Sequence, residues 1–314
     1  MPAGFLHLVG LTAPLFVLVA IGYALTRLGR WPMAAGDALT RFVFTVAIPT
    51  LLFRLMSEFA REPRVDTRLL VAYFGACLGV YVIGRFLAAV FFRMDGAAQS
   101  VFALAGIFSN NVLLGLPLAR IILGDAALPA VSLVLVFNSL LLWTLATVSI
   151  EWARHGAFSA RAFGRTVLGV LTNPVVASIL AGTAFGFTGL ALPGFVDETM
   201  TLLGNAAIPL SLVALGMGLA GFGARAGWRA SAAMTCIKLA VHPAAVYGLA
   251  RLLSLPPLET ATIVMLAALP VGANVYLMSR QFDVLTGAVA SAIVTTTALA
   301  ALTTPIVLAL VGAS

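Results

Sequence analysis

Three adjacent polar residues, Ser109, Asn110 and Asn111, interrupt an apolar stretch that runs from about residue 99 to residue 123. Hydroxyl and amide groups donate and accept hydrogen bonds without carrying charge, so these side chains suit the binding of a polar ligand. Gly115 and Pro117 follow in the same stretch, and proline removes an N–H donor from a helix while glycine permits unusual backbone angles. The stretch is therefore predicted to be a broken helix with a binding site at the break.

The composition places this break in a membrane. Of 314 residues, 61% are hydrophobic and 9% are charged, and the mean hydropathy is +1.09, whereas soluble domains carry about 25% charged residues. The 18 Lys and Arg residues are scattered singly between apolar segments. This pattern is typical of membrane topology signals and excludes a basic nucleic-acid-binding patch. The sequence thus predicts an all-α polytopic membrane protein whose surroundings are the lipid bilayer.

Ten apolar segments are available to cross the bilayer, which takes about 20 residues per helix. They are residues 5–26, 38–56, 69–92, 99–123, 127–151, 166–187, 196–220, 228–253, 259–280 and 285–311. The longest polar links are residues 57–68 and 152–165, so we expect no attached soluble domain. The N-terminus lacks a basic region and a small-residue cleavage site, so we expect no removable signal peptide.

The arginine distribution predicts the orientation of the chain. With the N-terminus outside, the cytoplasmic loops hold ten arginines and the outer loops hold six. The ten are Arg27, Arg30, Arg41, Arg93, Arg154, Arg161, Arg165, Arg225, Arg229 and Arg280, and the six are Arg54, Arg61, Arg64, Arg68, Arg120 and Arg251. Because cytoplasmic loops are richer in Lys and Arg, we expect both termini outside a plasma or inner membrane.

Several short motifs recur at an offset of 160 residues. The pairs are Leu11-Thr12-Ala13-Pro14 with Leu171-Thr172-Asn173-Pro174, Gly22 with Gly182, and Ala47-Ile48-Pro49 with Ala207-Ile208-Pro209. Each half would hold five helices, an odd number, so the second half would insert upside down, as in many secondary transporters. The alternative is a coincidence of two proline-bearing hydrophobic runs. We predict one five-helix repeat over residues 1–151, a short cytoplasmic link over 152–165 and the inverted repeat over 166–314.

The repeat requires a second broken helix in the ninth segment. The run from Leu269 to Asn274 contains Pro270, Gly272 and Asn274 and meets this requirement. Two interrupted segments at corresponding places in two halves are the best sequence indication of a binding site at the bilayer midplane. We therefore expect helices 4 and 9 to cross near Pro117 and Pro270, with Asn274 on the second side of the site.

Ionisable residues indicate the sign of the ligand. None of the 11 Asp and Glu residues lies at mid-membrane, and cation carriers generally need an intramembrane carboxylate. Lys238 lies about ten residues, and so about 15 Å, into its segment. It either attracts an anion or acts in gating, or it is neutral or tied to carbonyls freed at a helix break. His242 follows on the same helix face and is either a proton-linked switch or a hydrogen-bonding group within the bundle.

Other polar residues inside the apolar segments leave two interpretations open. Asn138 and Ser139 lie mid-way along the fifth segment. They either contribute to the site or form an interhelical hydrogen bond, worth about 0.6 kcal/mol on average. Cys77 and Cys236 have no second metal ligand nearby in the sequence and are interpreted as small buried hydrophobic residues.

These residues resemble the auxin efflux carrier family, and the resemblance covers essentially the whole chain. The motifs that carry it are Phe108-Ser109-Asn110-Asn111-Val112-Leu113-Leu114-Gly115-Leu116-Pro117, Leu171-Thr172-Asn173-Pro174, Ala207-Ile208-Pro209-Leu210-Ser211-Leu212, Lys238-Leu239-Ala240-Val241-His242-Pro243 and Ala268-Leu269-Pro270-Val271-Gly272-Ala273-Asn274. The short link at 152–165 is similar to the bacterial branch of the family. Family members often carry Gly or Thr where this chain has Asn110 and Asn111, so details of the substrate do not transfer.

The resemblance implies ten helices in two inverted repeats, with helices 4 and 9 crossing at prolines. It implies a scaffold of helices 1, 2, 6 and 7, a transport domain of helices 3–5 and 8–10, an elevator-type motion and a homodimer. Family members carry organic anions, which are auxin in plants and malonate or related carboxylates in bacteria. The asparagines of segment 4 and Asn138 match family positions near the substrate.

The leading hypothesis is a secondary carrier of small organic anions, without cofactor or bound metal and with Na⁺ or H⁺ as candidate coupling ions. The alternative is a Na⁺-coupled symporter of the bile-acid type. An intramembrane enzyme would need a nucleophile–base pair or metal cluster at membrane depth, and a sensor would need a signalling domain; neither is evident. The predicted substrate-binding residues are Ser109, Asn110, Asn111, Asn138, Ser139, Lys238 and Asn274, with Pro117 and Pro270 at the crossing and His242 as the candidate switch.

Overall fold

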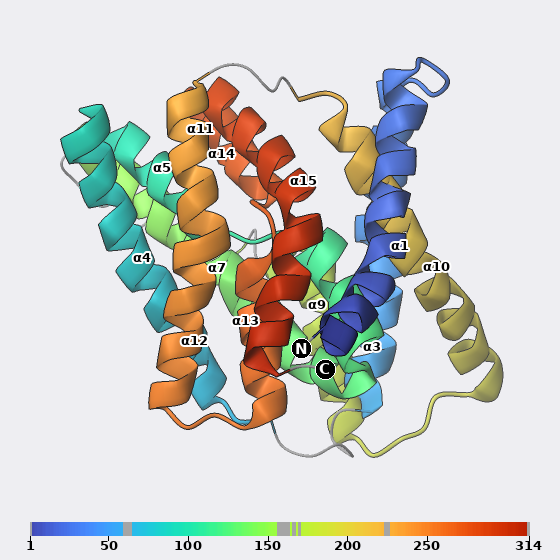
Figure 1. Ribbon diagram of the computed structural model, residues 1–314. Coiled ribbons are helices and arrows are strands. Elements are labelled where there is room, and N and C mark those ends of the chain that lie inside the picture. Colours follow the sequence, from blue (N-terminus) through green and yellow to red (C-terminus); the bar gives the residue numbers. More distant parts are fainter. Residues whose placement is uncertain are drawn as a thin grey trace.

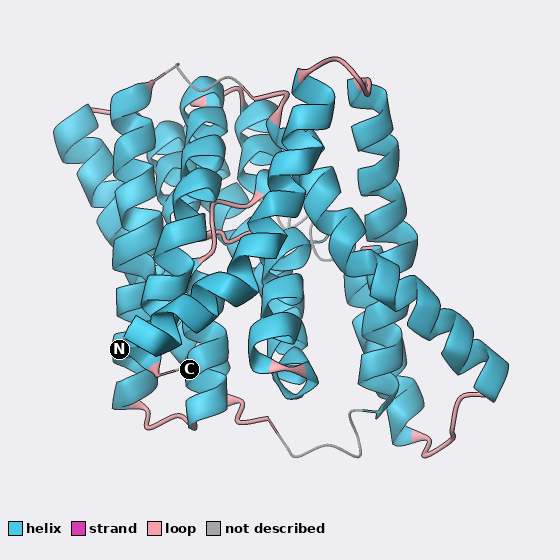
Figure 2. Cartoon of the chain, turned by 45° about the vertical axis from the view of Figure 1, so that its right-hand side comes forward, coloured by secondary structure: helices cyan, strands magenta, loops and turns pink. Residues whose placement is uncertain are grey.

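The computed structural model describes residues 2–58, 65–155, 171–222 and 227–312, together with residues 164 and 168. Within these ranges the regular elements are helices, and one isolated antiparallel bridge joins Ser109 to Val271. The helices form a bundle, and both termini lie near the same end of it (Figures 1 and 2). The predicted all-α fold class is confirmed.

Each of the ten predicted apolar segments overlaps one or more of the described helices. In the first half these are α1 (Pro2–Arg27), α2 (Met33–Phe42), η1 (Val43–Ala47), α3 (Ile48–Glu58), α4 (Arg68–Phe92), α5 (Gly96–Ile107), η3 (Asn111–Gly115), α6 (Leu116–Leu123), η4 (Asp125–Ala127) and α7 (Leu128–His155). In the second half they are α9 (Pro174–Phe187), α10 (Gly194–Leu219), α11 (Trp228–Cys236), η5 (Ile237–Val241), α12 (His242–Leu252), α13 (Pro257–Ala268), α14 (Ala273–Phe282) and α15 (Thr286–Val311). The link predicted at 152–165 lies mostly outside the described residues.

In the part of the chain that the structure describes, six helical stretches are long and apolar enough to cross a membrane. They are Leu8–Arg27, Met33–Glu58, Arg68–Phe92, Gly194–Leu219, Trp228–Leu252 and Thr286–Val311. Further apolar helices are shorter: Gly96–Ile107, Asn111–Leu123, Asp125–Asn138, Pro174–Phe187 and Pro257–Ala268. The two segments predicted to be broken are among the shorter ones because each is divided in the middle.

Three of the helical stretches contain a five-residue π-helical turn that ends two residues before a proline. These turns are η1, η3 and η5, and the prolines are Pro49, Pro117 and Pro243. Proline has no N–H, and its ring clashes with the carbonyl four residues earlier, whereas a π-helical turn widens the helix locally. The helix therefore continues past each proline instead of ending there. Pro117 belongs to the first turn of α6 and not to the break itself.

The two breaks lie in the middle of the bundle and pair with each other. Loop segments at mid-height between the helices are visible in Figure 2. The Gly272 N–H donates to the Phe108 carbonyl at 2.9 Å, and the Asn110 N–H donates to the Pro270 carbonyl at 2.9 Å. Leu269 ends α13 with extended backbone angles, which is the conformation favoured before a proline. The predicted break in each segment is confirmed, and the backbone groups freed by one break are satisfied by the other.

Gly272 and Thr296 make this pairing possible. A Cβ atom on Gly272 would lie 3.0 Å from the Ser109 carbonyl oxygen, so the two backbones approach closely only because this residue has no side chain. The hydroxyl of Thr296, on α15, accepts from the Val271 N–H at 3.1 Å and donates to the Ala292 carbonyl at 2.7 Å. The N–H of Val271, which takes part in the bridge, is thus hydrogen-bonded to α15.

Glycines bring two pairs of helices into backbone contact. A Cβ on Gly22 of α1 would lie 2.1 Å from the Val213 carbonyl oxygen of α10, and a Cβ on Gly182 of α9 would lie 2.5 Å from the Phe53 carbonyl oxygen of α3. Small residues at helix interfaces allow this close packing in membranes. The helices α1, α3, α9 and α10 form one side of the bundle in Figure 1.

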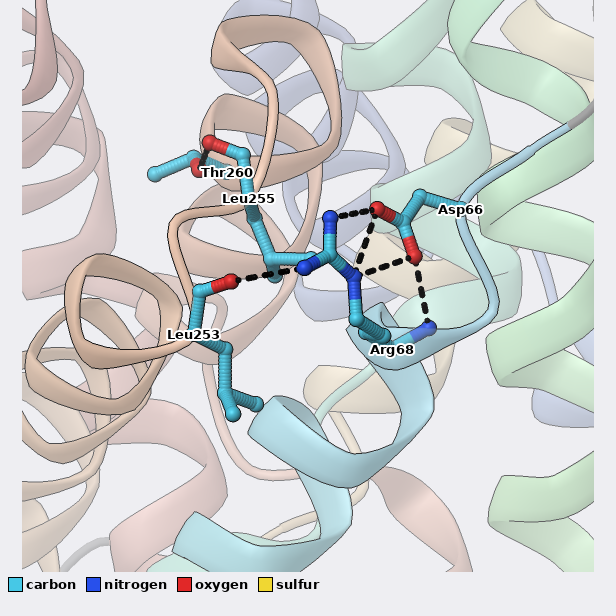
Figure 3. Close-up of polar contacts among 5 residues, drawn as sticks. All are labelled: Asp66, Arg68, Leu253, Leu255 and Thr260. Atoms are coloured by element: carbon cyan, nitrogen blue, oxygen red, sulfur yellow. Dashed lines mark hydrogen bonds and ion pairs between the residues drawn. The ribbon is translucent and has the colours of Figure 1, made fainter.

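An arginine ties α4 to the end of α12 (Figure 3). The Arg68 guanidinium donates to both carboxylate oxygens of Asp66 and, at 3.2 Å, to the Leu253 carbonyl. Hydrogen bonding by Arg68 holds the pKa of the Asp66 carboxyl below its usual value. In the first turn of α13 the Thr260 hydroxyl donates to the Leu255 carbonyl at 3.3 Å. These contacts fix the start of α4 beside the α12–α13 connection.

We predict that Gly22→Ala destabilises the protein because the new methyl group would overlap the Val213 carbonyl. Overpacking of this kind costs about 1–3 kcal/mol. Gly10→Ala on the same helix is the control, since a Cβ there meets no atom within 4 Å. Thermal unfolding in detergent should show a clear fall in Tm for the first variant and little change for the second. Equal Tm values would contradict the close contact.

We also predict that Thr296→Val weakens the break, because it removes the acceptor of the Val271 N–H while preserving the shape of the side chain. An unsatisfied buried donor costs about 1–3 kcal/mol. Thr297→Val is the matched control, since among the described residues the Thr297 hydroxyl bonds only to the Ile293 carbonyl of its own helix. The Tm of Thr296→Val should be several degrees below that of Thr297→Val, and the same Tm in both would show that Thr296 does not support the break.

Candidate functional site

The predicted residues of segment 4 lie at the break between α5 and η3. Ser109, Asn110 and Asn111 are all buried. Asn274, in the first turn of α14, is half-buried and lies two residues beyond Gly272, which takes part in the pairing. Pro270 lies within the second break. The structure therefore brings both predicted runs to one place, although Pro117 lies one helical turn away from it.

Several side-chain oxygens near the break are buried and have no hydrogen-bond partner among the described residues. They are Ser109 Oγ, Asn111 Oδ1 and Asn138 Oδ1. Asn138 is on α7, which packs against η3. Buried polar atoms are almost always paired, so unpaired ones at a helix break indicate space for water or a polar ligand. Ser139 follows Asn138 on α7, but its side chain lies outside the described residues.

Two helix N-termini begin at the breaks. The continuous helix of η3 and α6 begins at Asn111, and α14 begins at Ala273. The first turn of a helix has N–H groups without intrahelical partners and carries a partial positive charge. In the first of these helices the N–H groups of Leu114 and Gly115 bond to the Asn110 carbonyl. The remaining first-turn donors and the positive ends of both helices favour an anion between the breaks.

Lys238 supports the second break from η5. It is fully buried, and its ammonium nitrogen donates to the Ala267 carbonyl at 2.5 Å. Ala267 is in the last turn of α13, where carbonyls have no intrahelical donor and the helix end carries partial negative charge. The sequence left several interpretations of this lysine open. The contact that the structure shows is the one with a carbonyl freed at a helix break. Lys238 also offsets the negative helix end that would otherwise face the site.

A chain of buried contacts extends from Lys238 to the asparagines. The Nζ atom of Lys238 lies 3.2 Å from His242 Nδ1, and His242 Nε2 lies 3.3 Å from the Cys77 sulfur. The ring of Tyr73 meets that of His242 edge-on at 5.8 Å, and the Tyr73 hydroxyl accepts from Asn111 Nδ2 at 3.4 Å. All of these residues are buried. Cys77 is buried, as expected, but it is also part of a polar cluster. Cys236 was expected to be buried as well, and this was wrong, because it is exposed on α11.

Sequence reasoning missed three residues near the break, namely Tyr73, Thr296 and Ser211. The Ser211 hydroxyl, on α10, lies 3.1 Å from the Leu113 carbonyl, which precedes Pro117 by four residues and so lost its usual helical donor. Tyr73 and Thr296 are far from their partners in the sequence and lie in apolar runs without a distinctive motif. The family resemblance alone could have drawn attention to Ser211, because it follows the Ala207-Ile208-Pro209 motif.

Basic side chains, and not acidic ones, are buried near the breaks. Within the described ranges the buried basic residues are Lys238 and His242, and no Asp or Glu is buried there. No group of three or more His, Cys, Asp or Glu residues that could hold a metal ion occurs in this part of the chain. The acidic side chains of the described helices lie toward the helix ends, as Asp197 of α10 and Glu259 of α13 do.

Comparison with known proteins agrees with this architecture. The family described as "Membrane transport protein" matches residues 7–308. A protein of Rhizobium meliloti named "Putative malonate transporter" is 29% identical over 307 residues, which are 95% of this chain and 93% of that protein. An uncharacterized transporter of Methanocaldococcus jannaschii is 23% identical over 288 residues, covering 90% of this chain and 91% of its own. The chain therefore belongs to the membrane transport protein family, the auxin efflux carrier family whose motifs it carries, and is a multi-pass membrane transporter.

Proposed function

We propose that the protein is a secondary transporter that moves small organic anions, carboxylates such as malonate, across the cell membrane. The observation that carries this proposal is the pairing of two interrupted helices at buried asparagines, with both helix N-termini directed at the break. Discontinuous helices with opposed ends form the substrate sites of many secondary transporters. The bridge between Ser109 and Val271 joins the two halves of the chain and supports a site between them.

The charges near the break favour an anion over a cation. A charged group at the bilayer centre costs several kcal/mol unless it is compensated. A cation at the break would find no buried carboxylate among the described residues. An anion would find two positive helix ends, and Lys238 already compensates the negative end of α13. Electrostatics therefore supports a negatively charged substrate.

The amides suit a carboxylate in particular. Turning the Asn111 amide by 180° lets its Oδ1 accept the Tyr73 hydroxyl proton and leaves its N–H groups free to donate to a carboxylate oxygen. Asn274 and Asn138 offer further amide donors. The named malonate transporter of Rhizobium meliloti, which is similar over nearly the whole chain, supports a small dicarboxylate as the first candidate substrate.

Repeated contacts support an inverted five-helix repeat. The contact of Gly22 with Val213 and that of Gly182 with Phe53 are related by adding 160 to one member and subtracting 160 from the other. The same glycine position of one half therefore contacts the same position of the other half in both directions. The two backbone hydrogen bonds of the break also exchange, at an offset of 162: Asn110 corresponds to Gly272, and Phe108 corresponds to Pro270.

An elevator-type motion is the mechanism we propose for this arrangement. The scaffold would be α1, α2–α3, α9 and α10, and the transport domain would be α4–α7 and α11–α15. Both breaks then belong to the moving part, so the site would travel intact. Both termini near one end of the bundle are compatible with ten crossings, and the arginine distribution supports placing that end outside the cell.

We predict that Asn111→Ala or Asn274→Ala reduces uptake of labelled malonate into proteoliposomes at least tenfold, equivalent to about 1.4 kcal/mol. Each variant removes an amide at the break and leaves the helices in place. Asn205→Ala is the control, because Asn205 is exposed on α10. Tm and size-exclusion profiles establish that the variants are folded. Uptake at the wild-type level in both site variants would overturn the proposed position of the site.

A thermal-shift screen tests the class of substrate and the coupling ion. We expect dicarboxylates to raise Tm more than monocarboxylates or indole acids, since a ligand stabilises the folded state by RT ln(1 + [L]/Kd). The screen is run with Na⁺ and with an impermeant organic cation in its place. A shift that requires Na⁺ would instead favour a symporter of the bile-acid type, and no shift with any carboxylate would contradict the anion proposal.

A further inference from the structure

The pair formed by Lys238 and His242 can gain or lose one proton without losing its hydrogen bond. Both residues are fully buried, and Lys238 Nζ lies 3.2 Å from His242 Nδ1. A hydrogen bond between two nitrogens needs one of them as acceptor, so the pair cannot be fully protonated on both residues. With Nδ1 accepting, Nε2 carries the histidine proton and points to Cys77, 3.3 Å away. The lysine can then be an amine or an ammonium while these contacts persist.

The groups facing this pair supply no full negative charge. From α4 they are the Tyr73 ring and the Cys77 thiol, and from α13 the Ala267 carbonyl. Helices α5 and α15 also pack against η5, and neither contains a titratable side chain. The other uncharged titratable groups of the packed helices are the phenols of Tyr81 on α4 and Tyr247 on α12 and the exposed thiol of Cys236 on α11. The charged side chains of the packed helices stand toward helix ends or are bonded elsewhere: Arg68, Arg85, Arg229, Arg251 and Glu259.

An uncompensated ammonium at this depth is unfavourable. The Ala267 carbonyl and the C-terminal end of α13 compensate only part of its charge. An anion between the breaks would supply the missing negative charge. It would therefore favour the protonated state of the pair, and the protonated pair would favour the anion, because such coupling is reciprocal.

Two contacts connect the pair to the breaks. Lys238 holds the Ala267 carbonyl, at the end of the helix that leads into the second break. On the other side Tyr73 lies against His242 and bonds to Asn111 at the start of η3. A proton gained by Lys238 or His242 thus changes the charge of the packed cluster that includes Asn111.

We infer that Lys238 and His242 form a proton-binding site coupled to the anion site, so that each anion is carried together with a proton. The inference rests on the proposed transport of organic anions and adds the coupling ion to it. The proton enters from water in the open site, is held between Nζ and Nδ1 while the anion is bound, and leaves to water on the other side with the anion. On entry an O–H bond of hydronium breaks as an N–H bond of Lys238 forms, and on release the N–H bond breaks as the proton returns to water.

Calorimetry in buffers of different ionisation enthalpy tests this coupling directly. Malonate is titrated into the purified protein near pH 8, where carboxylates are ionised, and the slope of the binding enthalpy against buffer enthalpy gives the protons taken up. We expect about one proton per malonate. Malonate binding without proton uptake would overturn this inference and leave the proposed function standing. Absence of malonate binding would overturn both for this substrate.

Lys238→Arg separates the charge from its titration, because guanidinium remains protonated and can still donate to the Ala267 carbonyl. We expect this variant to bind malonate but to take up no proton, and its affinity should not change between pH 7 and 9. Wild-type affinity should strengthen as pH falls, by up to tenfold per unit where the site titrates. Cys236→Ser, an exposed cysteine on α11, is the control and should keep the wild-type proton count.

Lys238→Gln is the second variant, in case the larger guanidinium prevents folding of Lys238→Arg. Glutamine can still donate an N–H to the Ala267 carbonyl but does not titrate, so we expect no proton uptake with malonate. The wild-type measurement stands alone if neither variant folds. A variant that loses the lysine–histidine pair and still takes up one proton per malonate would place the proton elsewhere and overturn the assignment.

Discussion

The pairing of two helix breaks is the interaction on which the rest of this structure depends. In a bilayer no water is available to backbone groups that a break sets free, so each needs a partner from the protein. Here the segment around Ser109 and the segment around Val271 satisfy each other through two backbone hydrogen bonds. Neither break is stable in isolation under this constraint. The two halves of the chain are thus bound together at the place where each is most irregular.

The groups left over after this pairing are satisfied by side chains from other helices. Thr296 holds the Val271 N–H, Lys238 holds the Ala267 carbonyl, and Ser211 reaches the Leu113 carbonyl that Pro117 set free. Each contact places a different helix, respectively α15, η5 and α10, against the break. The position of the site thus follows from hydrogen bonding of the backbone more than from apolar packing.

The same contacts explain which features the sequence could predict. The breaks were predictable because polar residues, glycine and Pro270 stand where an apolar helix should continue, and the second break followed from the repeat. The partners of the breaks were not predictable. Thr296 and Tyr73 resemble many other residues of apolar helices, and only the three-dimensional packing distinguishes them. Lys238 was conspicuous as a charge, but its contact with Ala267 depends on the distance between two helices, which spacing in the sequence does not encode.

Pro117 shows a similar limit. Proline was a sound indication of irregular backbone, yet the helix continues through it by means of the π-helical turn η3, and the break lies a turn earlier. A π-helical turn precedes Pro49 and Pro243 in the same way. Each of these three prolines therefore follows a widened turn and leaves a carbonyl that needs a donor from outside the helix. At Pro270, by contrast, the preceding residue Leu269 adopts the extended conformation that ends a helix.

The origin of each supporting contact bears on how the site could move. In the proposed division, α4, η5 and α15 belong with both breaks, so Tyr73, Thr296 and Lys238 would travel with the site and its hydrogen bonds would stay closed throughout. Ser211 is on the scaffold side. Its hydroxyl also lies 2.8 Å from the Ile208 carbonyl of its own helix, so it has a second acceptor when the first withdraws. Loss of the hydrogen bond to Leu113 therefore costs little free energy. Opening either break would instead leave backbone N–H and C=O groups without hydrogen-bond partners in the membrane. Motion that keeps the breaks paired and slides them past α10 is the least costly path that these contacts allow.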